Sequence, residues 1–520
     1  MLFRSDKKSK LAAGSIITML GSVILRLGGF IYRFILSRLL TTAEYGIVGL
    51  TLPFQNTFII AASGGIPPAI AKYVSQYKAV DDKEMVHQIS VTGMKLMVFL
   101  AIIAAVIMLI ISEPVAINMW HKPEAILPLR LVSLIIPFSV IVGALRGIFQ
   151  GFYNMQDLFY SKFIEQIATL ILASSLVFIG WYAAGAVLGT ALGFMVSLFG
   201  SYYLYKRDIK DVYLNDEYEK ISFKEETKIM IQIFKFSIPV VISGIAEIIL
   251  YDSGTFFIGM FLPALFAGLY TNATAISRIP LIIANSISVS VLPATSEADS
   301  LSDSKLLKMY IHQAYRYTSL TSLPVTAFII SYSMPLLCLL FGDNFAAGAG
   351  ALSISASGMF FFSMYLIASS MCQGLGKPSF PMYSLIVGAI ISVVSCVVLI
   401  PLYDIRGASV STAFATFILM VMTIYEVTRL TKIHPPYKDL AKILVVTFIM
   451  MTIMDFAPQT LIGMIVGGAI ASVIYVVLIV YLRAIKSEDM VFVEHIVNKT
   501  GPLKKYLNKI VVKINNYIES

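Results

Sequence analysis

The chain has 520 residues, of which 58% are hydrophobic and only 13% are charged. A soluble domain carries about 25% charged residues, so this composition excludes an ordinary soluble protein and predicts one that crosses a membrane many times. The formal net charge of +9 does not indicate a nucleic-acid partner, because the basic residues lie mostly between apolar segments, as membrane topology requires. The three cysteines and five histidines show no spacing typical of a disulfide framework or a metal site.

The first apolar segment, from Leu11 to Leu40, is long enough to cross a bilayer, yet it contains Arg26 and Arg33. A charged side chain at that depth costs roughly 2.5–3.5 kcal/mol on insertion scales, so it usually faces a partner or a wet cavity. Our hypothesis is that both arginines line a cavity that receives an anionic group. The alternative is that they reach an interface or pair with a buried acid. At 100° per residue the polar side chains share one stripe, which comprises Ser15, Thr18, Ser22, Arg26, Gly29, Arg33 and Ser37.

Apolar segments of about 20 residues predict an all-α polytopic membrane protein with about 14 transmembrane helices. Lys and Arg gather in alternate loops, which places both termini in the cytoplasm. A Gly-Pro break, Gly64 to Pro68, lies inside the second span, and a basic loop with Lys72 and Lys78 follows it. The predicted spans are 12–39, 45–71, 89–112, 125–149, 159–180, 183–205, 231–260, 264–292, 310–340, 345–372, 379–400, 406–430, 439–456 and 459–483.

Three short motifs recur with a nearly constant offset. Gln150 recurs as Gln373 (offset 223), Gly46 as Gly268 (offset 222) and Pro68 as Pro293 (offset 225). They predict two parallel-repeat six-helix lobes, although chance matches of Gly and Pro at span ends remain an alternative. The expected organisation is an N-lobe (1–205), a cytoplasmic linker (206–230), a C-lobe (231–430), two further helices (431–483) and a tail (484–520). The tail has the pattern of a basic amphipathic helix that binds anionic inner-leaflet lipids.

Other polar residues inside predicted spans complete the candidate binding site. A cavity between the lobes would place three arginines together and favour a phosphate or carboxylate. The two acidic residues of span seven either neutralise the arginines, which we favour, or bind a coupling cation or proton. We interpret Glu165, near the inner end of its span, as structural. The candidate substrate-binding residues are Arg26, Arg33, Gln55, Asn56, Arg278 and Asn285, and the candidate coupling or neutralising residues are Glu247 and Asp252.

Soluble-enzyme motifs are absent from the sequence: there is no P-loop, no nucleophile arrangement and no metal cluster. We therefore predict that the protein is not an enzyme and holds no cofactor, with coupling to Na⁺, H⁺ or the membrane potential as the open possibilities. The predicted outer loops are very short. This argues against a membrane enzyme acting on sugars outside the cell, such as an oligosaccharide polymerase or ligase.

Several motifs carry a family resemblance: Ala43 to Gly46, Gly65 to Ala71, Arg146 to Gly151 with Asn154, and Ser277 to Pro280 with Leu292 to Ala294. Because of these motifs, the chain resembles the polysaccharide-biosynthesis branch of the multidrug/oligosaccharidyl-lipid/polysaccharide (MOP) flippase superfamily. It resembles in particular the stage V sporulation protein B group, which is related to the lipid II flippase. The resemblance implies alternating access and movement of a polyprenyl-pyrophosphate-linked sugar from the inner to the outer leaflet of the cell membrane.

The resemblance also implies that cavity arginines on spans one, two and eight engage the pyrophosphate. Arg26, Arg33 and Arg278 match spans one and eight, whereas span two has Gln55 and Asn56 and no arginine. That departure leaves room for a glycan other than lipid II. Spans thirteen and fourteen would form a groove for the lipid tail, and glycan-assembly enzymes would be partners. The alternatives are a cation-coupled multidrug exporter of the same superfamily and a non-transporting scaffold of an envelope or sporulation complex.

Overall fold

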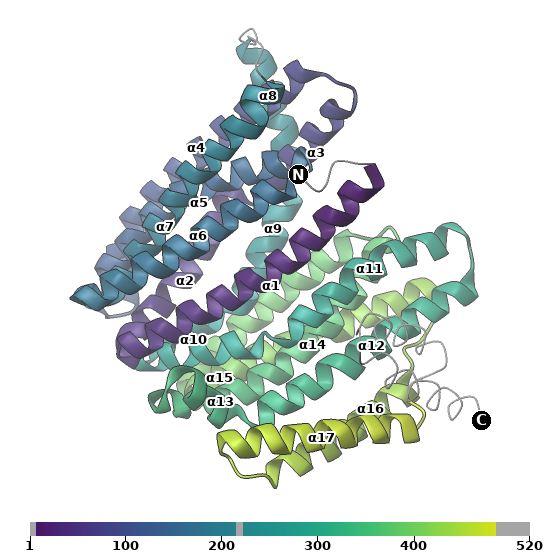
Figure 1. The fold of residues 1–520 in the computed structure, drawn as a ribbon. Coiled ribbons are helices and arrows are strands. Elements are labelled where there is room, and N and C mark those ends of the chain that lie inside the picture. The colour runs from purple at the N-terminus through teal and green to yellow at the C-terminus, as the bar shows by residue number, and fades with distance from the viewer. Residues whose placement is uncertain (1–6, 215–221, 485–520) are drawn as a thin grey trace. The chain divides into compact units, whose positions relative to one another are not determined.

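The computed structural model describes residues 7–214 and 222–484, with the backbone alone for residues 7–20, 22 and 23. Every regular element in these ranges is helical and no strand occurs there, which confirms the predicted all-α class. The predicted amphipathic tail lies outside the described residues, apart from Ala484. The α-helices (Figure 1) are α1 (Lys7–Leu39), α2 (Thr42–Ser63), α3 (Ile66–Ala79), α4 (Lys83–Pro114), α5 (Ile126–Gly151), α6 (Met155–Leu176), α7 (Tyr182–Tyr205), α8 (Asp211–Tyr213), α9 (Phe223–Phe261), α10 (Ala264–Ser277), α11 (Pro280–Ser300), α12 (Ser304–Ser331), α13 (Ser333–Phe341), α14 (Ala349–Gly374), α15 (Ser379–Thr431), α16 (Tyr437–Asp455) and α17 (Leu461–Tyr481).

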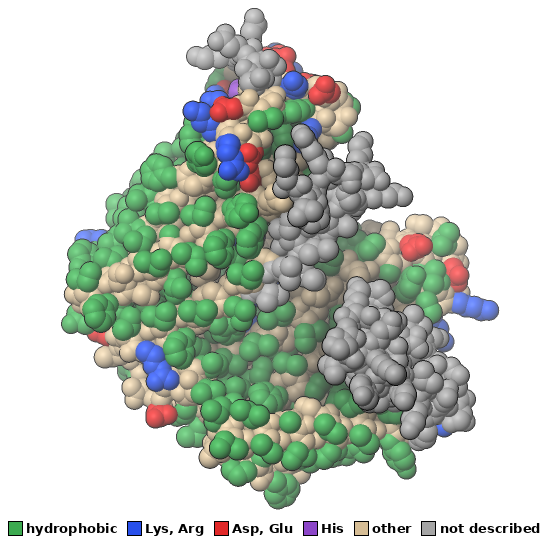
Figure 2. All heavy atoms as spheres, in the orientation of Figure 1, with side chains coloured by type: hydrophobic (Ala, Val, Ile, Leu, Met, Phe, Trp, Pro, Cys, Tyr) green, Lys and Arg blue, Asp and Glu red, His purple; other side chains and the backbone are tan. Residues whose placement is uncertain are grey.

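Nine helical runs of the described chain are long and apolar enough to cross a membrane, or ten if α12 and α13, bent by 77°, form one span. On α4, the side chains of Phe99, Ile102 and Ile110 are each more than half exposed. Figure 2 shows hydrophobic side chains over most of the visible surface, while many of the charged side chains gather near the end where α8 lies. A soluble protein rarely exposes so much apolar surface, so these helices belong in lipid. The total of 14 spans stays a prediction.

The helical run that comprises α6 and α7 is 59 residues long and folds back on itself. A straight helix of that length would extend about 90 Å, three times the hydrocarbon core of a bilayer. The backbone leaves helical geometry at Gly180, where φ is +99°. Gly189 packs directly against Ala173. Gly193, one turn later, packs against Thr169, one turn earlier, so α6 and α7 are antiparallel and cross the membrane twice.

Helix α15 contains a second reversal of the same kind. Tyr403 and Asp404 have non-helical dihedral angles, with a φ of 52° at Asp404. Gly388 packs against Leu419, two positions nearly equidistant from the break, so the two halves of α15 are also antiparallel. The sequence predicts a turn at this place, between residues 400 and 406.

The second predicted span is broken into α2 and α3 at Gly65, whose φ of +80° favours glycine. Pro67 follows in the first turn of α3, where its missing N–H costs nothing. The predicted basic loop after residue 71 is wrong, because α3 continues to Ala79. Lys78 lies in the last turn of that helix, where a cation is favourable. The eighth predicted span is likewise divided, into α10 and α11, with Pro280 at the start of α11.

The described residues divide into two compact units. The first unit contains the chain up to Thr271 together with Ser392–Ala408, the middle of α15. The second unit contains Asn272–Ile391 and the chain from Ser409 onward. A buried core of the second unit joins α11, α12, α14 and α15, and a further one joins α12 and α13 to α16 and α17. The predicted lobe boundaries stay a prediction.

Candidate functional site

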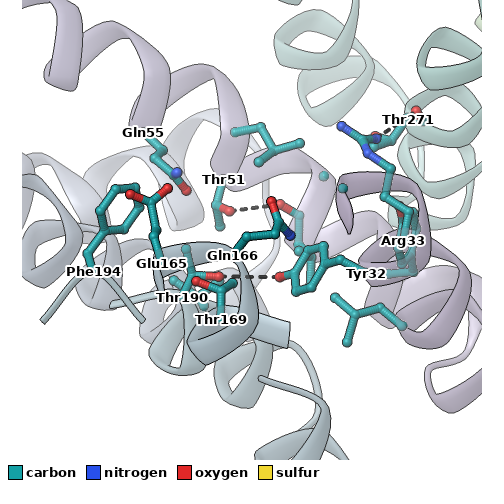
Figure 3. Close-up of a pocket in the computed structure, with 17 residues that line it drawn as sticks. Tyr32, Arg33, Thr51, Gln55, Glu165, Gln166, Thr169, Thr190, Phe194 and Thr271 are labelled. Atoms are coloured by element: carbon teal, nitrogen blue, oxygen red, sulfur yellow. Dashed lines mark hydrogen bonds between the residues drawn. The ribbon is translucent and has the colours of Figure 1, made fainter. Parts of the chain in front are cut away.

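The first unit encloses a polar cavity of about 260 Å³. Its walls come from α1, α2, α6, α7 and the middle of α10, and polar side chains from all five helices face it (Figure 3). The residues that line this central cavity, as we call it, are Gly29, Tyr32, Arg33, Leu36, Tyr45, Val48, Gly49, Thr51, Leu52, Gln55, Glu165, Gln166, Thr169, Val187, Thr190, Phe194 and Thr271.

Helix α1 contributes one face to the cavity, because Gly29, Arg33 and Leu36 recur three or four residues apart. A Cβ atom added at Gly29 would meet nothing within 4 Å, so the cavity reaches the backbone of α1 there. Gly28, the next residue, packs tightly against the side chain of Gln166 on α6. Arg26 is exposed and lies on the same stripe as Arg33, about 10 Å away along the helix axis, but it does not line the cavity.

Arg33 is the cation of the central cavity. Its guanidinium donates a long hydrogen bond, 3.4 Å, to the backbone carbonyl of Thr271 at the far wall. No acidic side chain in the described part of the chain forms an ion pair with it. The half-buried guanidinium keeps further N–H donors that can bind an anion in a bidentate manner.

Glu165 is the acidic residue that lines the cavity. Its charge is compensated by Arg146, which does not line the cavity. One carboxylate oxygen accepts a 2.6 Å hydrogen bond from Arg146 on α5. The Nε of Arg146 also donates to the hydroxyl of Ser161, at 2.9 Å, and a further N–H lies 3.4 Å from the Ser197 hydroxyl. The structural interpretation of Glu165 therefore holds in part, since it is ion-paired, but its side chain also faces the cavity.

The rest of the lining combines uncharged polar side chains with apolar ones such as Leu36, Val48 and Leu52. The side-chain amides of Gln55 and Gln166 form no hydrogen bond to any residue that the structure describes. Tyr32 and Thr190 share a hydrogen bond of 3.3 Å across the cavity (Figure 3). Phe194 presents the one phenyl ring among the lining residues. Such a lining can hydrogen-bond a hydroxyl-rich ligand beside a charged one.

Asn56 and Asp252, both predicted site residues, meet each other away from the central cavity. The amide of Asn56 donates a 3.0 Å hydrogen bond to the carboxylate of Asp252 on α9. Asp252 lines a second cavity of about 310 Å³, whose other walls include Phe54, Phe256 and Phe257. Glu247, five residues earlier on α9, is exposed and lines neither cavity.

Arg278 and Asn285 belong to the second unit. Arg278 is half-buried at the break between α10 and α11, where its carbonyl accepts from the Leu281 N–H. Asn285 is exposed on α11. The binding roles of both residues stay predictions, as does that of Arg26.

Sequence reasoning noted Glu165, Gln166 and Thr169 together in one apolar span but did not assign them to the binding site, and it missed the α7 wall. Gln166 and Thr169 are polar residues of an apolar span, spaced so that they share a face with Glu165, and that spacing was the available signal. Thr190 and Phe194 are four residues apart on α7, but a threonine and a phenylalanine are ordinary residues of a transmembrane helix. Tyr32 lies beside Arg33 and outside the polar stripe.

The sequence is similar to a protein family and to several known membrane proteins. A family model described as "Polysaccharide biosynthesis protein" matches residues 11–299. The lipid II flippase MurJ of Bacillus subtilis is 26% identical, over 86% of this chain and 88% of its own. Stage V sporulation protein B of the same organism is 24% identical, over 93% of this chain and 97% of its own. An uncharacterized membrane protein of Methanocaldococcus jannaschii is 27% identical, over 78% and 94%.

Solved structures show the same fold. The inward closed conformation of the lipid II flippase MurJ has a TM-score of 0.71 at 15% identity, over 90% of this chain and 99% of that one. An inward-facing multidrug resistance MATE family transporter of the MOP superfamily has a TM-score of 0.65 at 17% identity, over 78% and 96%. The chain therefore has a fold of MOP-superfamily transporters and is a multi-pass membrane protein, as its composition predicts.

Proposed function

Because the chain belongs to the polysaccharide biosynthesis protein family, we propose that it is a flippase for a lipid-linked oligosaccharide. In this proposal it moves a polyprenyl-pyrophosphate-linked glycan from the inner to the outer leaflet of the cell membrane. The names of two relatives support this class of substrate: the lipid II flippase of Bacillus subtilis, and the "Probable low-salt glycan biosynthesis flippase" of Haloferax volcanii, which is 22% identical over 47% of this chain.

One observation carries the proposal: Arg33 lies in a polar cavity among apolar helices and has no acidic partner in the described chain. A charge held among apolar helices without a counter-ion is costly, so it favours an anionic ligand as the missing partner. Guanidinium groups bind phosphate oxygens through paired, charge-assisted hydrogen bonds. The uncharged polar lining suits the hydroxyl groups of a sugar.

The mechanism follows from the two parts of such a substrate. The charged sugar head group cannot enter lipid without losing its water, whereas the polyprenyl tail can stay in the bilayer throughout. A central cavity that opens to one side of the membrane and then to the other would carry the head group across. We propose alternating access of this kind, with the pyrophosphate held by Arg33.

A cation-coupled multidrug exporter is the alternative within this fold. Such a protein needs an unneutralised acid in its cavity to attract a cationic drug. Here the cavity acid, Glu165, is already paired with Arg146, and the uncompensated charge is that of Arg33. This arrangement favours an anionic substrate. Asp252 and Glu247 remain our candidates for coupling to Na⁺ or H⁺ or for neutralising charge.

A flipping assay in proteoliposomes tests the proposal. Purified protein is reconstituted with polyprenyl-pyrophosphate-linked N-acetylglucosamine, and an impermeant galactosyltransferase outside the vesicles reports the accessible fraction. We expect wild-type protein to move the glycan lipid from the inner to the outer leaflet of the vesicles, where the enzyme modifies it. Arg33→Gln should lower the rate of this movement at least about tenfold, because a charge-assisted contact is lost. Uptake of ethidium with no flipping of the glycan lipid would support the multidrug alternative and contradict our proposal.

A further inference from the structure

We propose that one wall of the central cavity is a subsite for a single uncharged sugar residue, formed by Gln55, Glu165, Gln166 and Phe194. We call these four residues the sugar subsite. The inference rests on the proposed function, because it assigns the part of the substrate that Arg33 does not hold. It predicts an oriented head group, with its phosphate at Arg33 and its first sugar at α6 and α7.

Phe194 has the position of a stacking platform. Its side chain is half-buried on α7, and its ring lines the cavity as the Glu165 carboxylate does (Figure 3). Among the described residues, no other aromatic ring packs against it. One face of a pyranose ring carries several C–H groups, which are attracted to the negative face of an aromatic ring.

Glu165 supplies a fixed acceptor in the same cavity. The ion pair with Arg146 engages one carboxylate oxygen and, together with Ser161 and Ser197, holds the pair in place. The other carboxylate oxygen has no partner in the described chain and can accept from a sugar hydroxyl. A hydrogen bond to an ionised acceptor is roughly twice as strong as one between neutral groups.

The two amides complete the subsite. Gln55 approaches from α2 and Gln166 from α6, and neither amide is satisfied within the described residues. Each amide offers two donors and one acceptor oxygen, which match the mixed donor and acceptor character of hydroxyl and acetamido groups. Gln166 is also held in position, since Gly28 of α1 packs against its side chain.

Charge and size decide which sugar fits. A uronic acid would place its carboxylate against the Glu165 oxygen that Arg146 does not engage, so the subsite favours a neutral sugar over an anionic one even though the Arg146–Glu165 pair carries no net charge. The cavity volume of about 260 Å³ is below the range of roughly 300–1,000 Å³ for ligand pockets. One sugar residue and the phosphate are therefore held here, and the remainder of a longer glycan lies outside the central cavity.

Calorimetric binding to the purified full chain in detergent tests the subsite. The probes are farnesyl pyrophosphate, its N-acetylglucosamine-linked form and its glucuronic-acid-linked form. We expect wild-type protein to bind the N-acetylglucosamine probe about tenfold more tightly than farnesyl pyrophosphate. The glucuronic acid probe should show no such gain.

Two sets of variants assign the gain to the subsite. Phe194→Ala, and Phe194→Leu as the better-packed replacement, should bring the ratio of the two affinities to within about twofold of one. Phe199→Ala is the matched control, because Phe199 lies on the same helix with 67% of its surface exposed, and it should keep the wild-type ratio. The double variant Glu165→Gln/Arg146→Gln removes both charges together and should let the glucuronic acid probe bind as tightly as the neutral one.

The outcomes separate the two proposals. Wild-type protein that binds farnesyl pyrophosphate and its sugar-linked form equally would overturn the sugar subsite and leave the flippase proposal standing. The sugar subsite would also be overturned, and the flippase proposal left standing, if both Phe194 variants and the double variant kept the wild-type ratio of affinities for the N-acetylglucosamine probe and farnesyl pyrophosphate. Failure of wild-type protein to bind any of the three probes would overturn both.

Discussion

Arg146 on α5 and Glu165 on α6 form a 2.6 Å ion pair in which the carboxylate faces the central cavity and the guanidinium lies behind it. Their side chains are 17% and 23% exposed, so both charges are largely removed from solvent. The pair lets an acid line the cavity without giving the cavity a net negative charge. This leaves the charge of Arg33 to determine which ligands enter.

We expect removal of either partner alone to destabilise the protein. Arg146→Gln leaves the Glu165 carboxylate without its counter-ion, and Glu165→Gln leaves the guanidinium without its counter-ion, at a cost of about 3–5 kcal/mol each. The double variant removes both charges and should recover most of that loss. Thermal unfolding in detergent, followed by circular dichroism, measures this. Single variants as stable as wild-type protein would show that the ion pair contributes nothing.

A size series at Gly29 should separate transport from stability. Gly29 is helical and faces open space, so Gly29→Ala should stabilise α1 by about 1 kcal/mol and leave transport nearly intact. Gly29→Leu should keep that stability while its side chain fills the cavity, and flipping should fall at least about tenfold. The flipping assay and the unfolding temperature are measured on the same preparations. Full transport by the leucine variant would contradict the position of the cavity.

Alanine at Gly189 should have the opposite effect on stability. A Cβ atom at that position would lie 2.2 Å from the Cα of Ala173, in the contact between α6 and α7. The helices must separate to admit it, which costs about 1–3 kcal/mol as overpacking does. A lower unfolding temperature is expected, with Gly29→Ala as the matched glycine-to-alanine control. An unchanged unfolding temperature would show that this hairpin is less tightly packed than described.

Lys122, in the connection between α4 and α5, should contribute more to the stability of the fold than the exposed ion pair between Arg130 and Glu113. Its ammonium donates to the carbonyls of Trp120, at 3.1 Å, and Gly259, at 2.6 Å, and burial lowers the pKa of Lys122 below its usual value. Lys122→Met leaves two carbonyls unpaired and should cost about 1–3 kcal/mol. Arg130→Gln breaks only the exposed pair with Glu113 and should stay within about 1 kcal/mol of wild-type protein. Equal unfolding temperatures for the two variants would contradict this.

The same lysine gives a pH dependence with a defined sign. Because the folded-state pKa of Lys122 is lowered, the folded protein binds fewer protons at this site than the unfolded chain between the two pKa values. The contribution of Lys122 to stability should therefore increase as pH rises through that alkaline window. The difference in unfolding temperature between wild-type protein and Lys122→Met, measured from pH 7 to pH 10, should widen. A constant difference would mean that the pKa is not shifted.

The sequence predicts where helices lie far better than it predicts which helices pack against one another. Hydropathy places the turns near Gly180 and Asp404 because loss of helical geometry there coincides with the ends of apolar runs. The sequence does show the Gly64–Pro68 break inside the second span, but hydropathy does not reveal that the chain continues as one helix, α3, to Ala79, because the apolar run ends at Ala71. The family resemblance, carried by short motifs at such breaks, is confirmed by the family model.

The candidate site shows the same limit. Helical periodicity along α1 correctly places Arg33 and Gly29 on one face, since a single helix sets that geometry. It cannot tell that Gln55 faces the central cavity while Asn56, its neighbour, turns to Asp252 on α9. That distinction depends on which helices surround α2. The contribution of Glu165 was underestimated for a similar reason, because its partner Arg146 is on another helix.

In the proposed function, the cavity beside Arg33 holds water and a pyrophosphate head group. The first measurement is therefore labelling of Gly29→Cys by a membrane-impermeant maleimide, on a background without Cys338, Cys372 and Cys396. We predict labelling that farnesyl pyrophosphate suppresses, and no labelling of the lipid-facing control Phe199→Cys. A Gly29→Cys protein that stays unlabelled from both sides of the membrane, or whose labelling farnesyl pyrophosphate does not change, would contradict it.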